Sequence, residues 1–175
     1  MSKYKQPHLW YILYARSRCE NNLHYCLERR DMDSFLPKIR VPSKRKDRKL
    51  MIQKPLFPGY TFVRTNMDRY EHYGIVKAAG FVRIIGNRTG PLPVPEETVD
   101  SLKIIVSKGL PIVTGRRFRK KERIMVISGP FAGVSGYFSS YRGKGRVIVN
   151  IDALNQFASV EIEENDIESL PEILR

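Results

Sequence analysis

The sequence predicts an α+β fold in two parts: an antiparallel sheet domain flanked by helices, then a small β-barrel. Up to about residue 110, short apolar strands and amphipathic helices alternate in a mixed order that is typical of an α+β domain. After residue 120, short β-rich segments recur between glycine-rich turns, as in small barrels. The charge changes at the same point, because residues 1–123 carry a net charge of +16 and residues 124–175 carry −3.

The first part opens with a strand and a helix. Leu9–Ala15 is apolar, short and rich in aromatic residues, so we expect a buried strand. Ser17 and Glu20 have the spacing of a capping box, which predicts a helix that begins there and ends near Arg30. Its apolar face would carry four residues at helical spacing: Cys19, Leu23, Cys26 and Leu27.

Further strands and helices complete the first part. We expect strands at Ser34–Val41, Leu50–Lys54, Thr61–Thr65 and Phe81–Ile85, and helices at Arg69–Ala79 and Pro95–Gly109. Pro37 places the first of these strands at a sheet edge, because proline cannot donate a ladder hydrogen bond. Pro95 suits the first position of a helix, and Gly80 suits the end of one.

The second part is predicted to be all-β. Its strands are expected at Ile124–Ile127, Gly136–Ser139, Arg146–Ile151 and Ala158–Ile162, with a closing edge at Ile167–Leu170. The β-branched residues of these segments favour a permanent barrel. The predicted organisation is a first domain at 1–110, a linker at 111–120 and a second domain at 121–175.

Several classes of protein are excluded. No apolar run approaches the ~20 residues that span a membrane, so we expect a cytoplasmic protein. Cys19 and Cys26 would lie ~10 Å apart along one helix face, which is too far for a disulfide. Neither they nor the histidines have metal-ligand spacing, and no nucleophile elbow or phosphate loop occurs. We therefore expect a monomer that is not an enzyme and binds no metal or cofactor.

The most specific motif lies at the start of the second part. Ile124–Ile127 followed by Ser128–Gly136 resembles a KOW motif, in which Phe131 folds back to close one end of the barrel. A generic hairpin would explain the glycines but not the whole pattern.

The first part also resembles a known domain. Trp10-Tyr11, the segment Phe57–Val63 and Phe81-Val82 resemble the NGN domain of NusG-family transcription elongation factors, and the order NGN, linker, KOW covers nearly the whole chain. The basic loop at Lys44–Lys49 is similar to that of a specialised, operon-specific paralogue of the RfaH, LoaP or UpxY kind.

The resemblance implies that the NGN domain binds the clamp of the largest subunit of RNA polymerase, suppresses pausing and promotes antitermination. The residues that it implies for contact with RNA polymerase are Trp10, Tyr11, Phe57, Pro58, Tyr60, His72, Tyr73 and Phe81. Among them, His72 and Tyr73 fall where the resemblance implies a bridge to the opposite lobe of the cleft, although the threonines of that segment are absent. Aromatic residues in a shallow patch suit docking onto an apolar helix face. The alternative for each ring is ordinary core packing.

Basic residues are the candidates for contact with non-template DNA or nascent RNA. They are Arg16, Arg18, Lys44, Arg45, Lys46, Arg48 and Lys49. Contact with phosphates would release counterions and make binding depend steeply on salt. The alternative is a solvated hairpin tip.

In the second domain, the resemblance implies that an exposed loop recruits the terminator Rho or a small-subunit ribosomal protein. The corresponding residues are Leu154, Asn155, Gln156 and Phe157. The aromatic-Gly-Arg pattern common at this place is absent, which disfavours Rho and fits an antiterminator. The alternative function is a KOW-containing ribosomal or RNA-binding protein, although the acidic second part disfavours it.

Overall fold

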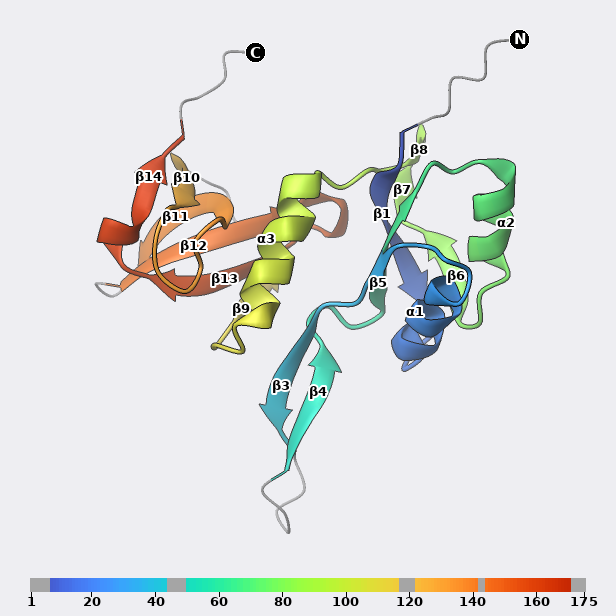
Figure 1. Ribbon diagram of the computed structural model, residues 1–175, viewed down its shortest axis with the longest axis horizontal. Helices are drawn as coiled ribbons and strands as arrows, with labels where there is room; N and C mark the ends of the chain where they lie inside the picture. Colours follow the sequence, from blue (N-terminus) through green and yellow to red (C-terminus); the bar gives the residue numbers. More distant parts are fainter. Residues whose placement is uncertain (1–6, 44–49, 117–121, 142–143, 171–175) are drawn as a thin grey trace. The chain divides into compact units, whose positions relative to one another are not determined.

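The computed structural model describes residues 7–43, 50–116, 122–141 and 144–170 (Figure 1). They form two compact units that divide between Pro95 and Glu96. The first unit combines helices with an antiparallel sheet and the second is mostly β-structure, so the predicted α+β fold is confirmed.

The first unit is built on a four-stranded sheet in the order β2-β5-β1-β6. Its strands are β1 (Leu9–Ala15), β2 (Ser34–Phe35), β5 (Tyr60–Thr65) and β6 (Phe81–Ile84). β1 is central and pairs antiparallel with β5 and β6. Apolar residues on both of its faces are buried, as its aromatic-rich sequence predicts.

Helices α1 (Glu20–Glu28) and α2 (Arg69–Val76) cover one face of this sheet (Figure 1). The core beneath them is formed by Leu13, Ala15, Leu23, Leu27, Met32, Val63, Ile75 and Ala78. The predicted capping box at the start of α1 is wrong. Arg18 takes a left-handed conformation with φ 63°, which delays the helix until after Cys19, and Cys19 makes no side-chain cap.

A separate hairpin extends from the first unit. β3 (Lys38–Pro42) and β4 (Met51–Pro55) pair antiparallel as a two-stranded ribbon that points away from the four-stranded sheet (Figure 1). The predicted strand at Ser34–Val41 is therefore two strands, which Leu36 and Pro37 separate because the proline cannot continue the ladder. A second, smaller ribbon joins β7 (Gly86–Asn87) and β8 (Gly90–Pro91).

The second unit contains a six-stranded antiparallel sheet in the order β14-β10-β11-β12-β13-β9. The strands are β9 (Val113–Arg116), β10 (Glu122–Val126), β11 (Ser135–Tyr141), β12 (Lys144–Ile151), β13 (Gln156–Ile162) and β14 (Ile167–Ser169). Two short 3-10 helices, η1 (Asp152–Leu154) and η2 (Glu164–Asp166), join the last strands. Phe131 is buried, as its expected role in closing the barrel requires.

Helix α3 (Glu96–Ser107) belongs to the second unit, although the sequence placed it in the first domain. The buried Ser101 hydroxyl accepts a hydrogen bond from the Ser135 amide at 3.0 Å and donates one to the Ser135 carbonyl at 3.3 Å. Glu97 pairs with Arg123 at 2.5 Å. The proposed linker also contains structure, because Val113–Arg116 forms β9 and pairs with β13.

Among the described residues, none of the helices combines the length and the apolar composition that crossing a bilayer requires. Both cysteines are free thiols with intermediate exposure.

Candidate functional site

Two tyrosines and an arginine form a row across three strands of the first unit. Tyr14 of β1 lies opposite Tyr60 of β5 and Arg83 of β6 in the strand register, so all three side chains share one sheet face. The two tyrosine rings are 5.5 Å apart and tilted by 48°. The Arg83 guanidinium lies 5.8 Å from the centre of the Tyr14 ring, within cation–π range. We call these three residues the tyrosine row.

The tyrosine row is open to solvent. Tyr14 is 37 % exposed, Tyr60 is partly exposed and Arg83 is exposed. Aromatic rings that carry a polar tip and sit beside a cation suit a partner surface with both apolar and acidic groups.

The structure does not gather the predicted aromatic residues into one patch. Trp10 and Phe57 are 2 % and 0 % exposed, so their side chains are core residues and cannot serve as the direct contacts that the sequence suggested. Tyr11 and Phe81 pack against the core cluster under α1 and α2, on the opposite face from Tyr14. Only Tyr60 of these rings joins the tyrosine row.

The turn before Tyr60 is held by a buried carboxylate. The Glu20 side chain accepts a hydrogen bond from the Gly59 amide at 2.8 Å, which ties the first turn of α1 to the turn that carries Pro58. Gly59 has φ +87°, and a Cβ atom there would lie 3.0 Å from the Tyr14 ring. Glycine therefore allows both the turn and the approach of Tyr14. Pro58 is exposed beside it.

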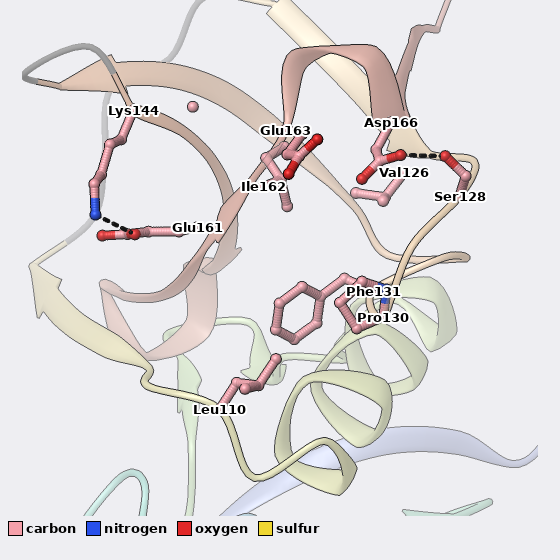
Figure 2. Close-up of a pocket in the computed structure, with 11 residues that line it drawn as sticks. Leu110, Val126, Ser128, Pro130, Phe131, Lys144, Glu161, Ile162, Glu163 and Asp166 are labelled. Carbon is pink, nitrogen blue, oxygen red and sulfur yellow. Dashed lines mark hydrogen bonds and ion pairs between the residues drawn. The ribbon is translucent and has the colours of Figure 1, made fainter.

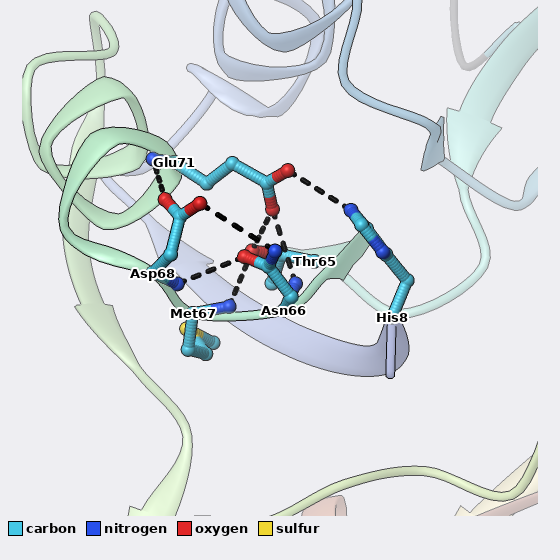
Figure 3. A network of polar contacts seen from close by, with 6 residues as sticks. All are labelled: His8, Thr65, Asn66, Met67, Asp68 and Glu71. Carbon is cyan, nitrogen blue, oxygen red and sulfur yellow. Dashed lines mark hydrogen bonds and ion pairs between the residues drawn. The ribbon is translucent and has the colours of Figure 1, made fainter. Parts of the chain in front are cut away.

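A polar network fixes the start of α2 (Figure 3). One Glu71 oxygen accepts from the Thr65 hydroxyl at 2.6 Å and from the Asn66 amide at 3.0 Å. The other lies 2.9 Å from His8 Nε2. Asp68 caps the helix by accepting from the Glu71 amide at 2.8 Å. The network thereby joins α2 to the start of β1 and the end of β5.

The network also sets the acidity of its carboxylates. Burial raises the pKa of Glu71, but hydrogen bonds from Thr65, His8 and Asn66 outweigh it and hold that pKa below its ordinary value. The Glu71 amide likewise holds the pKa of the capping Asp68 low. Both side chains therefore stay ionised in neutral solution.

Helix α2 presents its other side to solvent. His72 and Tyr73, the two predicted bridging residues, are both exposed there. The Lys77 ammonium lies 5.6 Å from the centre of the Tyr73 ring. The structure therefore leaves both residues accessible, in contrast to Trp10 and Phe57.

The candidate nucleic-acid residues fall into two groups. Arg16 and Arg18 are exposed at the end of β1, where the Arg16 amide donates to the Gly80 carbonyl at 2.8 Å. The other predicted cations, Lys44, Arg45, Lys46, Arg48 and Lys49, lie outside the described residues. In sequence they lie between β3 and β4, the two strands of the ribbon, on which Arg40 and Lys54 are exposed.

The predicted partner loop of the second unit is only partly open. Leu154 and Gln156 are partly buried, and Asn155 is exposed in a left-handed conformation. Phe157 packs against β9, since a Cβ atom on Gly115 would meet its ring at 2.8 Å. Asn155 is thus the most accessible of the four predicted residues.

Sequence reasoning missed Tyr14 and Arg83. The strict alternation of side chains along a strand was the available signal, because it places Trp10, Ile12 and Tyr14 on one face of β1 and Tyr11 and Leu13 on the other. Arg83 could not be found in this way, since its place beside Tyr14 depends on the pairing of β1 with β6.

The chain is similar to known transcription proteins. The family "Transcription termination factor nusG" matches residues 8–103. The transcription termination/antitermination protein NusG of Bacillus subtilis is 27 % identical, with 92 % of this chain and 98 % of that protein covered. NusG of Neisseria meningitidis is 25 % identical, with 92 % and 97 % covered.

A solved structure shares the fold. The structure titled "Domain interaction in Thermotoga maritima NusG" matches with a TM-score of 0.52 at 19 % identity, over 94 % of this chain and 98 % of that one. The α+β sheet of the first unit and the six-stranded sheet of the second therefore have the fold of NGN and KOW domains. We call the second unit, which also contains α3, the KOW unit. Since the family match covers more than half of the sequence, the chain belongs to the NusG family of transcription factors.

Proposed function

We propose that this protein binds RNA polymerase through its NGN domain, suppresses pausing and promotes antitermination and processive elongation. Its partner on the polymerase is the helical hairpin of the clamp in the largest subunit. The KOW domain recruits a further factor, either Rho or a small-subunit ribosomal protein. The activity is binding alone, and no covalent chemistry is involved.

The tyrosine row carries this proposal. A clamp hairpin offers an apolar helix face with charged flanks, and the row offers two adjoining rings with a guanidinium beside them. The Glu20–Gly59 hydrogen bond supports the turn that leads to Tyr60. Preorganisation of this kind lowers the entropic cost of binding. His72 and Tyr73 on α2 supply the second contact, to the opposite lobe of the cleft.

Nucleic acid is the second proposed partner. Arg16 and Arg18 are exposed on the same unit, and the basic segment at 44–49 lies in sequence between the two strands of the β3–β4 ribbon. These cations contact the phosphates of non-template DNA or nascent RNA at the upstream edge of the bubble. That this chain is a specialised paralogue, rather than the general factor, stays a prediction from its basic loop.

Binding of the full chain to purified core RNA polymerase tests the proposal. Tyr60→Ala is expected to weaken binding about tenfold or more, as for an interface residue that contributes ~1.4 kcal/mol or above. Tyr14→Ala should have a similar effect, since each ring supports the other.

Tyr25→Ala is the matched control. Tyr25 of α1 is 58 % exposed, and Arg29 lies over its ring at 5.8 Å, as Arg83 does over Tyr14. If Tyr25→Ala weakens polymerase binding as much as Tyr60→Ala does, or if neither change has an effect, the tyrosine row is not the polymerase contact.

A further inference from the structure

The KOW unit contains an apolar groove whose rim is acidic (Figure 2). The cavity measures about 550 Å³. Its apolar lining is supplied by Leu110, Val126, Pro130, Phe131 and Ile162. Val126 and Phe131 are buried, whereas Leu110 is 43 % exposed. A second hollow of about 260 Å³ shares Leu110 and Phe131 and continues the apolar surface toward Val113.

The charges at the rim are mostly negative. Glu161 accepts from Lys144 at 3.0 Å and from Arg146 at 2.9 Å, so one carboxylate is shared by two cations and the unbalanced negative charge of the rim lies at Glu163 and Asp166. The side-chain hydrogen bond from Lys144 and then that from Arg146 hold the pKa of Glu161 below its ordinary value. Glu163 and Asp166 add two more carboxylates at the other side of the groove. Glu163 is exposed and forms no ion pair with any residue in the described part of the chain.

The acidic side of the groove is built with defined geometry. The Ser128 hydroxyl donates to the Asp166 carboxylate, and the Ile127 amide donates to the Asp166 carbonyl at 2.8 Å. Gly129 has φ +75°, and a Cβ atom there would lie 2.8 Å from the second Asp166 oxygen. Because Gly129 has no side chain, the turn after β10 can approach Asp166 closely, and the Asp166 carboxylate stays at the rim of the groove.

We infer that this groove binds a basic peptide segment of another protein, which inserts one apolar side chain between Leu110 and Phe131 and places lysines or arginines against Glu163 and Asp166. The complementary charge argues for this occupant, since the carboxylates repel nucleic-acid phosphates and acidic peptides. The net charge of −3 over residues 124–175 acts in the same direction. The inference rests on the proposed recruiting role of the KOW unit, but it assigns a surface distinct from the loop at 152–157.

A titration of the isotope-labelled full chain tests the groove. The probe is the peptide acetyl-Lys-Lys-Lys-Leu-Lys-Lys-Lys-amide, and backbone amide shifts are followed by NMR. Saturable shifts are expected at Leu110, Phe131, Ile162 and Glu163. Replacement of the central leucine by serine should weaken binding about tenfold, because the apolar side chain then leaves the groove unfilled.

Charge reversal at the rim gives the matched pair of variants. Glu163→Lys should weaken peptide binding about tenfold, whereas Glu168→Lys, which makes the same charge change on the exposed strand β14 outside the groove, should alter it less than twofold. Glu163 makes no ion pair with a described residue, so its replacement should leave the fold intact, as dispersed amide spectra would verify.

Three results would overturn the inference: shifts confined to another surface, equal affinity for the serine peptide, or equal loss in both charge variants. Sedimentation of the chain alone is a further test. A dimer that Glu163→Lys abolishes would assign the groove to a second copy instead. Polymerase binding is measured with the same variants. Its loss would count against the proposed function, whereas loss of peptide binding alone would count against the groove only.

Discussion

The Glu20 carboxylate accepts a hydrogen bond from the Gly59 amide at 2.8 Å across 39 residues of sequence. Both residues are buried, and the bond joins the first turn of α1 to the turn before β5. A buried hydrogen-bond acceptor is stabilising only while its donor is present. This contact therefore couples the helix to the position of Tyr60.

Glu20→Ala should lower the free energy of unfolding by about 1–3 kcal/mol, because the Gly59 amide then loses its buried acceptor. Urea unfolding of the full chain measures this. Glu28→Ala, on the exposed side of the same helix, should change the stability by less than about 0.5 kcal/mol. Equal effects of the two changes would mean that the Glu20–Gly59 bond contributes nothing specific.

Tyr60→Ala and Phe57→Ala should separate binding from stability. Tyr60 is partly exposed, so its truncation should weaken polymerase binding with little change in unfolding free energy. Phe57 is fully buried, so Phe57→Ala should lower the unfolding free energy by about 3–5 kcal/mol. Calorimetry and polymerase binding on both variants check this. If Phe57→Ala kept its stability but bound polymerase more weakly, Phe57 would be a direct polymerase contact and not a core residue.

Ser101→Ala should destabilise the KOW unit. The change removes the acceptor of the buried Ser135 amide, at an expected cost of about 1–3 kcal/mol. Ser107→Ala is the control, because its hydroxyl bonds only to the Ile104 carbonyl of its own helix and is exposed. Hydrogen exchange of the β11 and β12 amides gives the readout. If the amides of those strands exchanged at the same rate in Ser101→Ala, the hydrogen bonds between α3 and β11 would not stabilise the barrel.

Stability should fall in acid through Glu71. Its folded pKa lies below the ordinary value of 4.5, so the folded state favours the ionised form. The resulting stabilisation is present above pH 4.5 and is lost as the pH falls through the lower folded pKa. Glu71→Gln should flatten the dependence of unfolding free energy on pH below 4.5. If the unfolding free energy depended on pH in the same way in both proteins, the Glu71 network would not contribute to stability.

Neutralisation of the basic segment should alter the salt dependence of nucleic-acid binding. With Lys44, Arg45, Lys46, Arg48 and Lys49 changed to glutamine, the slope of log affinity against log salt should fall by up to about 4 for a single-stranded oligonucleotide.

The comparison variant changes four cations on or next to α1 and α2 to glutamine: Arg29, Arg30, Arg69 and Lys77. It should keep the original slope. A reduced slope in this variant alone would place the nucleic acid on the helical side of the unit and leave the segment at 44–49 as a solvated tip.

Much of the fold follows from local pattern. The strand at Leu9–Ala15 matches β1 at both ends, because its apolar and aromatic residues and its flanking polar residues mark it clearly. The KOW motif likewise located the barrel and the buried Phe131. The start of α1 was misplaced, because Glu20 has the same sequence spacing whether it bonds to its own helix or to Gly59.

The sequence by itself determined the two-part α+β architecture, the division of charge and the family, since these depend on periodicity, composition and short motifs. Only the tertiary structure decided which aromatic rings are buried and which are accessible, and that α3 packs on the barrel strands. The physical reason is that burial depends on the pairing of distant segments. Strand register places Tyr14 beside Tyr60 and Arg83, whereas no local pattern separates Phe57 from Tyr60.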